Sequence, residues 1–215
     1  GAGRPLHFGR TFATAGVALP AFFVALLLQV LFFRILHLLP VATSGDISVT
    51  LAHPIQTVTG LPLVDSLITG NSAAFWDNVK HTILPVLALT AYPTGVVMRM
   101  TRSSMLETLE QDYVRMERAM GIPSRVIILK YGLKNAMAPI LTVIGLMFAY
   151  SLTGTFFIEL LFSWPGLGMY ATMSLLGLDY PAIMGVTVLV AFVYVVINLI
   201  VDLVLARVDP RLVLE

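Results

Sequence analysis

The sequence predicts an all-α membrane protein, a polytopic bundle of transmembrane helices with one charged cytoplasmic segment. Hydrophobic residues make up 58% of the 215 residues and charged residues only 12%, whereas soluble globular domains average about 25% charged. The mean hydropathy is +0.90, and a soluble domain of this length has too small a core to bury so much apolar surface. Uncharged runs of about membrane-spanning length alternate with segments that carry the charges.

The first predicted span, residues 11–33, is a run of 23 residues without a charge. About 20 apolar residues cross a bilayer, and Pro20 predicts a kink that neighbouring helices can accommodate. A connection rich in Thr, Ser, Gly and Pro follows at residues 34–80 and is predicted to lie outside. Within it, residues 64–68 predict a short interfacial helix.

Three further uncharged spans are predicted, at residues 81–98, 136–158 and 180–201. In the middle one, small residues recur at every fourth position, a pattern that lets helices approach closely. These residues are Gly145, Ala149 and Thr153. The run at 159–179 is also mostly uncharged, but serine, proline and glycine interrupt it early, so we expect an outer loop there and not a fifth span.

Charge is concentrated in residues 99–135, between two predicted spans. Apolar residues in its first part recur at spacings of four or three, the pattern of one helical stripe. They are Met105, Leu109, Tyr113, Met116 and Met120. The pattern predicts a helix over about 105–120 that ends at Gly121, because a glycine after a helix commonly takes the left-handed conformation. Pro123 prevents the helix from resuming, and Ser124 can cap a second short helix.

Basic residues predict the orientation of the chain in the membrane. Eleven of the thirteen Lys and Arg lie in residues 1–10, in residues 99–134 or after residue 201. The two outer connections contain only Arg34 and Lys80. Four spans with both termini of this fragment in the cytoplasm satisfy this distribution.

Several short motifs follow one another in the second half of the chain. Residues 112–115 read Asp-Tyr-Val-Arg, Ala119 and Gly121 follow, and residues 134–136 read Lys-Asn-Ala before Pro139. In this order they resemble the ATPase-coupling loop of ABC importer permeases, and more narrowly that of the dipeptide/oligopeptide/nickel permease group. Other motifs that fit this group are Thr-Arg-Ser-Ser-Met-Leu at 101–106, Phe-Ser-Trp-Pro-Gly-Leu-Gly at 162–168, Asn198-Leu199-x-x-Asp202 and Asp-Pro-Arg at 209–211. Together the motifs cover roughly residues 80 to 213.

Two residues depart from the pattern of these permeases. Lys134 stands where the broader importer motif has proline. This departure from proline is normal for the peptide group. Glu117 stands where the coupling motif usually has a small residue, so the docking surface itself differs at this position.

The resemblance implies a type I ABC importer fold, with four spans and a cytoplasmic coupling helix in this chain. It implies a first-permease-like subunit of the cytoplasmic (inner) membrane, with an amino-terminal part of about two more spans expected before Gly1. Such a subunit forms the path for di- or oligopeptides that an extracytoplasmic binding protein delivers. The implied ATPase-coupling residues are Asp112, Tyr113, Val114, Arg115, Met116, Glu117, Arg118, Ala119, Met120 and Gly121.

The resemblance also implies the partners of this chain. They are a second homologous permease, two ABC ATPase subunits, the binding protein and membrane lipid. ATP and Mg²⁺ would bind in the ATPase subunits, and we expect no cofactor in this chain. Its four histidines are scattered and it has no cysteine, so we expect no metal site. Since the basic residues flank spans and form no separate patch, we expect no nucleic-acid binding.

Other functions remain open on the sequence alone. A nickel or other small-solute permease belongs to the same group, and an amphipathic helix over 105–120 can also rest on the inner leaflet. An ion-coupled secondary transporter would call for ionisable residues within its spans and for inverted repeats, and neither is seen in the sequence. The sequence has no G-x-x-x-x-G-K-[ST] loop and no catalytic motif, so we expect no enzymatic activity from this chain.

Glu159 closes the third span among apolar neighbours. A carboxylate near the membrane interior is costly and is by default a functional candidate. It can belong to the substrate path or outer gate, together with Trp164, Pro165 and Gly166. Alternatively it makes a structural hydrogen bond that holds the loop after the span.

Overall fold

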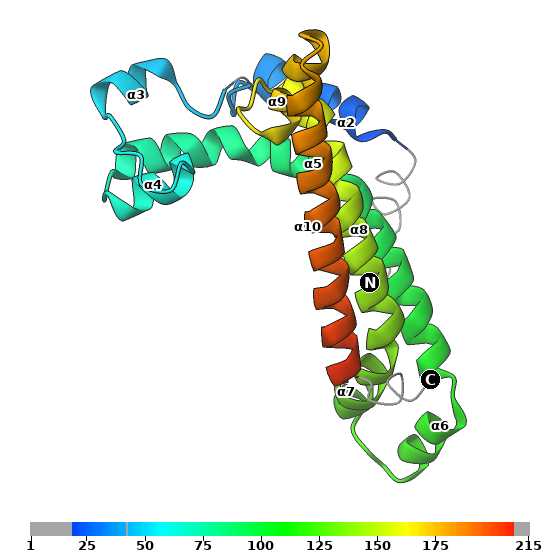
Figure 1. Cartoon of the computed structure of the whole chain (residues 1–215). Helices are drawn as coiled ribbons and strands as arrows, with labels where there is room; N and C mark the ends of the chain where they lie inside the picture. Colours follow the sequence, from blue (N-terminus) through cyan, green and yellow to red (C-terminus); the bar gives the residue numbers. More distant parts are fainter. Residues whose placement is uncertain (1–18, 42, 209–215) are drawn as a thin grey trace. The chain divides into compact units, whose positions relative to one another are not determined.

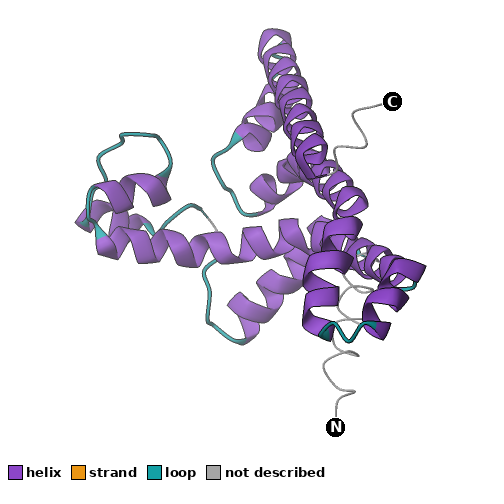
Figure 2. Ribbon diagram, turned by 90° about the horizontal axis from the view of Figure 1, so that it is seen from below, coloured by secondary structure: helices purple, strands orange, loops and turns teal. Residues whose placement is uncertain are grey.

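The structure, a computed structural model, describes residues 19–41 and 43–208 (Figure 1). Every regular element in this part of the chain is a helix (Figure 2). The order is α2 (Ala21–Leu28), the π-helical η1 (Gln29–Ile35), α3 (Ile47–Ala52), α4 (Pro62–Ile68), α5 (Ser72–Leu109), α6 (Asp112–Ala119), α7 (Ser124–Val126), the π-helical η2 (Ile127–Gly132), α8 (Leu133–Leu161), α9 (Leu167–Leu176) and α10 (Tyr180–Val208). The predicted all-α class is therefore confirmed.

Three helices are long and apolar enough to cross a membrane, at Ser72–Leu109, Ser124–Leu161 and Tyr180–Arg207. They contain the last three predicted spans. The helices extend well beyond those spans, because charged residues at a span's ends do not interrupt the backbone hydrogen bonds within a helix. The run expected as an outer loop at 159–179 contains the short helix α9, and its outer position stays a prediction.

The first predicted span is described only in part. Residues 11–18 lie outside the described residues, and the remainder forms an apolar helix at Ala21–Ile35 that is shorter than 18 residues. A fourth span at 11–33 thus stays a prediction. Pro20 is the N-cap of α2 and does not kink a helix interior as we expected, because a residue without an N–H is tolerated where the helix begins.

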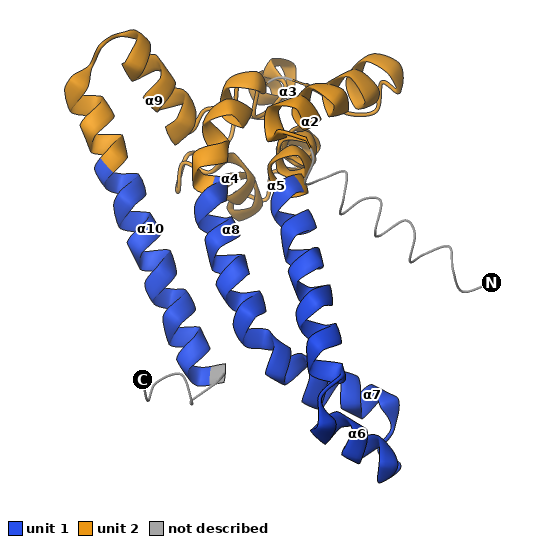
Figure 3. Cartoon of the chain, turned by 90° about the vertical axis from the view of Figure 1, so that its right-hand side faces the viewer, with its two compact units in different colours: residues 1–18, 92–151, 188–215 blue, residues 19–91, 152–187 orange. Residues whose placement is uncertain are grey.

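The chain falls into two compact units (Figure 3). Unit 1 comprises Tyr92–Ser151 and the described part of Val188–Glu215, and unit 2 comprises Leu19–Ala91 and Leu152–Thr187. Helices α5, α8 and α10 each contribute residues to both units.

Unit 1 contains a close approach of α8 to α10. A Cβ atom placed on Gly145 would lie 2.6 Å from Cγ2 of Val201, so only glycine fits there. Ala149, the next member of the predicted small-residue face, is buried, whereas Thr153 is exposed. The small-residue pattern thus marks a close helix contact at its first position, Gly145.

Unit 2 has a core built from α2, α5 and the end of α8. Its buried members are Ala25, Leu84, Ala88, Ile158 and Phe162. Lipid tails are as apolar as these side chains, so packing and not water exclusion holds such helices together. Small alanines on α2 and α5 allow the close packing.

The connection before α5 in unit 2 contains α4, which confirms the short helix expected at 64–68, and a buried carboxylate, that of Asp65. Oδ1 of Asp65 accepts hydrogen bonds from Oγ1 of Thr59 (2.6 Å) and its backbone N–H (2.7 Å), and Oδ2 accepts one from Gly60 (3.0 Å). These bonds favour the ionised form. The side-chain hydrogen bond of Thr59, followed by its backbone N–H, lowers the pKa of Asp65 below the ordinary value of 3.8.

We predict that acid opens this loop. A lowered folded-state pKa means that the stabilisation by Asp65 is complete above the unfolded pKa of about 3.9 and is lost as the pH falls through the lowered value. The protection of the amides of residues 57–70 against hydrogen exchange, relative to an unstructured peptide at the same pH, should therefore be high at neutral pH and lost only in strong acid. Asp65→Asn should lose this protection at neutral pH, because its amide NH₂ replaces one of the two acceptor oxygens and leaves a donor of residues 59–60 without a partner. Equal protection in both proteins at neutral pH would contradict this assignment.

Candidate functional site

Helix α6 lies in unit 1 between the membrane-length helices and has the charge pattern of a stable short helix (Figure 3). Asp112 lies in its first turn and Arg118 in its last, and both complement the helix dipole. Nη1 of Arg115 lies 3.2 Å from Oδ1 of Asp112. Both side chains of this pair are largely exposed, so the pair adds little stability.

The predicted continuous helix over 105–120 is wrong. Helix α5 ends at Leu109, and α6 begins at Asp112 after Gln111, which has extended backbone angles (φ −64°, ψ 150°). Met105 and Leu109 approach Gly132 of η2, since a Cβ there would lie 3.2 and 3.1 Å from their side chains. The apolar stripe of the sequence is therefore divided between an internal contact and α6.

The apolar side chains of α6 divide between its two faces. Val114 is completely buried. Tyr113, Met116 and Met120 are 37%, 62% and 61% exposed. Large apolar side chains exposed on a charged eight-residue helix are available to a partner.

Gly121 ends α6 in the way that its position predicts. Its φ is +77°, the left-handed region, which confirms the prediction. The N–H of Gly121 donates to the carbonyl of Arg118 (3.0 Å) and that of Ile122 to the carbonyl of Glu117 (3.2 Å). This pair of bonds is a Schellman motif, which directs the chain away from the helix end.

Glu117, the departure from the resembled motif, is half-buried on α6. Its Oε2 is buried and has no hydrogen-bond partner among the described residues. Buried polar atoms are nearly always hydrogen-bonded. The side chain thus has an unused acceptor next to the exposed methionines of α6.

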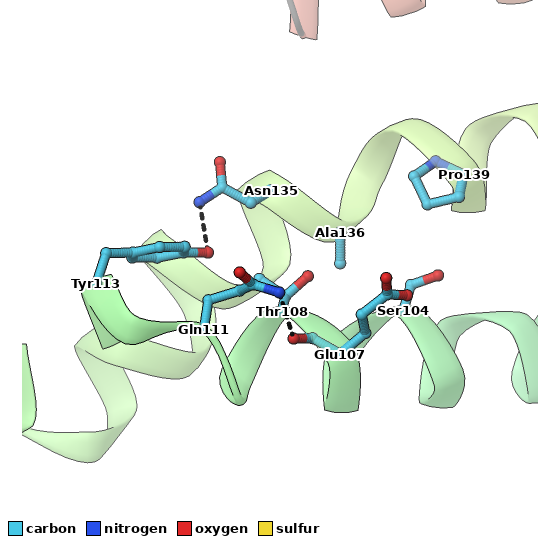
Figure 4. Close-up of a pocket in the computed structure, with 8 residues that line it drawn as sticks. All are labelled: Ser104, Glu107, Thr108, Gln111, Tyr113, Asn135, Ala136 and Pro139. Atoms are coloured by element: carbon cyan, nitrogen blue, oxygen red, sulfur yellow. Dashed lines mark hydrogen bonds between the residues drawn. The ribbon is translucent and has the colours of Figure 1, made fainter. Parts of the chain in front are cut away.

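A polar cavity of about 530 Å³ lies within unit 1, at the junction of α5, α6 and α8 (Figure 4). On one side, Nδ2 of Asn135 donates to the hydroxyl of Tyr113 at 2.9 Å. The cavity is lined by Ser104, Glu107, Thr108, Gln111, Tyr113, Asn135, Ala136 and Pro139. The sequence places Tyr113 in the apolar stripe of residues 105–120 but does not predict its hydrogen bond to α8. The signal that could have indicated this bond is Asn135 in the Lys-Asn-Ala motif.

The second group of candidate residues lies in unit 2 around Glu159. Its Oε2 accepts the N–H of Met169 in the first turn of α9 at 2.9 Å. A Cβ on Gly166 would collide with the same carboxylate, and a Cβ on Gly168 would lie 2.6 Å from Cα of Phe156. The loop therefore closes tightly around Glu159, which supports the structural alternative.

Trp164 and Pro165 belong to the same loop in different ways. The N–H of Trp164 donates to the carbonyl of Glu159 at 2.8 Å. Trp164 and Glu159 are also among the residues that line a cavity of about 210 Å³ between α5 and α8. Pro165 is exposed.

Comparison with known proteins places the chain in a family. Residues 4–214 match the model for the binding-protein-dependent transport system inner membrane component. The chain is 42% identical over 206 residues to the probable D,D-dipeptide transport system permease protein DdpB of Escherichia coli K12, covering 96% of this chain and 60% of that protein.

Two dipeptide transport system permease proteins DppB are similarly related. That of Alkalihalophilus pseudofirmus is 42% identical over 200 residues (93% of this chain, 59% of the relative), and that of Escherichia coli K12 is 40% identical over 207 residues (96% and 60%). The chain therefore spans about 60% of the length of these relatives. The match over nearly the whole chain and the long apolar helices agree on a multi-pass membrane protein. The chain belongs to the family of binding-protein-dependent transport system inner membrane components.

Proposed function

We propose that this chain forms the translocation path of an ATP-driven importer for di- and oligopeptides, as part of one of its two permease subunits. The names of its relatives support peptides as the substrate. The observation that carries the mechanism is α6, a charged helix with exposed Tyr113, Met116 and Met120 between two membrane-length helices. Such a helix suits docking into a cleft of another protein.

The remaining subunits follow from this proposal. Two ABC ATPase subunits bind ATP and Mg²⁺ on the cytoplasmic side, one of them on α6, and a second homologous permease completes the pore. An extracytoplasmic binding protein delivers the peptide. Closure of the ATPase pair on ATP moves α6, and the spans joined to it reorient the pore. A donor from the ATPase would satisfy the buried oxygen of Glu117.

The proposal is tested by purifying the whole transporter with its binding protein and reconstituting it in vesicles. Peptide uptake should require ATP, and an ATPase subunit should co-purify with the permease. ATP-independent uptake driven by an ion gradient would favour a secondary transporter instead. Competition of uptake by nickel, but not by dipeptides, would assign the small-solute alternative.

Orientation gives a separate prediction, because the basic residues predict that α6 and both ends of the chain lie inside. Single cysteines are easily introduced, since the chain has none. We expect an impermeant thiol reagent to label Ser48→Cys in intact cells and to label Ser124→Cys only after lysis; both positions are exposed. Met173→Cys, at a side chain 54% exposed in the run at 159–179, should label in intact cells like Ser48→Cys. Labelling of Ser124→Cys from outside would reverse the orientation.

A further inference from the structure

The polar cavity beside α6 has a lining that suits a cation. Its walls supply the carboxylate of Glu107, the amide oxygens of Gln111 and Asn135, and the hydroxyls of Ser104 and Thr108. None of its eight lining residues is basic. The volume of about 530 Å³ far exceeds the roughly 10–15 Å³ that one water occupies by this measure. A side chain of another protein can therefore enter it.

Glu107 is placed unfavourably for the chain by itself. It lies in the last turn of α5, a turn without a basic residue, where the helix dipole disfavours a negative charge. Among the described residues its carboxylate has no ion-pair partner within 4.0 Å. The Glu107 side chain is also exposed, so its charge is available to another molecule.

We propose that this cavity receives an arginine side chain of the ATPase subunit that docks on α6. The inference rests on the proposed function, which brings the ATPase to this helix. Tyr113 joins the two surfaces, since it lines the cavity and is 37% exposed on α6. A guanidinium carries five N–H donors in a fixed plane and no acceptor. It matches a wall made of one carboxylate and several neutral oxygens better than an ammonium does.

The test uses the complete transporter and replaces the charge in the cavity. A docked ATPase would cover the exposed Glu107 and desolvate its charge pair. Loss of one partner of such a pair weakens association strongly, so we expect Glu107→Gln to lower the affinity of the ATPase for the permease about tenfold and Glu107→Lys about a hundredfold or more. The measurement is ATPase binding to permease in lipid nanodiscs at several salt concentrations. Glu110→Lys is the matched control, because Glu110 carries the same charge nearby and is exposed like Glu107 but does not line the cavity.

The outcomes separate this inference from the proposed function. Glu107→Lys should lose binding while Glu110→Lys keeps it, with equal thermal unfolding of the two permeases. If the wild-type permease binds the ATPase and both lysine variants bind it equally well, the arginine does not enter this cavity, although α6 can still be the docking helix. If Glu107 binds a lipid ammonium instead, the ATPase affinity is also unchanged and the inference falls. If the ATPase does not bind the wild-type permease at all, the proposed function itself falls, and the inference with it.

Discussion

Gly121→Val is expected to leave the permease in the membrane at normal levels but to abolish the stimulation of ATP hydrolysis by the loaded binding protein. A side chain at φ +77° costs roughly 1–2 kcal/mol, and more for a β-branched residue. No atom lies within 4 Å of the new Cβ, so the cost comes from the backbone alone. Relief of this strain breaks the Schellman bonds and re-aims the segment after α6. Co-purification of the ATPase and stimulated hydrolysis measure the effect.

Two other substitutions at Gly121 isolate this cause. Gly121→Ala should be milder, because alanine is not β-branched. Gly121→Asn should be close to wild type, since asparagine visits the left-handed region readily. A helix that merely rests on lipid predicts little change from any of the three. Wild-type ATPase association and hydrolysis in Gly121→Val would contradict the docking assignment of α6.

Gly168→Ala is expected to reduce the yield of folded transporter severely. The new methyl group would lie 2.6 Å from Cα and 2.9 Å from N of Phe156, and backbone atoms cannot rotate away. Overpacking of this kind costs about 1–3 kcal/mol or more, and α9 must separate from α8, which breaks the bond from Met169 to Glu159. Thermal unfolding and size-exclusion chromatography report the loss. The matched control is Gly185→Ala in α10, where no atom lies within 4 Å and alanine should be neutral or stabilising.

The same contact can be probed from Glu159. Gln still accepts the N–H of Met169 but loses the charge near the start of α9, whereas Ala removes the acceptor, so we expect Glu159→Ala to unfold at a lower temperature than Glu159→Gln. Transport should fall only as far as the folded protein does. A fully assembled Glu159→Gln transporter without transport would assign the carboxylate to the substrate path. For the preceding variant, an unchanged melting temperature of Gly168→Ala would show that the loop does not hold α9 against α8.

The sequence by itself determined the features that depend on local patterns. Uncharged runs located the three membrane-length helices, because about 20 apolar residues satisfy a bilayer wherever they occur. The left-handed end of α6 was predictable because Gly121 and Pro123 act within one turn of the helix. The short helix at 64–68 was predictable for a similar reason, although the exact ends of α5 were not, since a helix continues beyond its apolar part into water.

Only the tertiary structure decided the features that join distant residues. The break before α6 and the bond between Tyr113 and Asn135 depend on how α5, α6 and α8 meet, and so does the cavity that contains Glu107. At the end of α9 even the local pattern is insufficient. A glycine after a helix commonly takes the left-handed conformation, which would be Gly177 here, but the structure has Leu178 in that conformation, with φ +53°. The N–H of Asp179 donates to the carbonyl of Ser174, while the Asp179 carboxylate accepts the N–H of Ala182 at the start of α10. Helix periodicity and turn propensity act over a few residues, whereas these positions are set by the contacts and caps of neighbouring helices, which a single sequence does not contain.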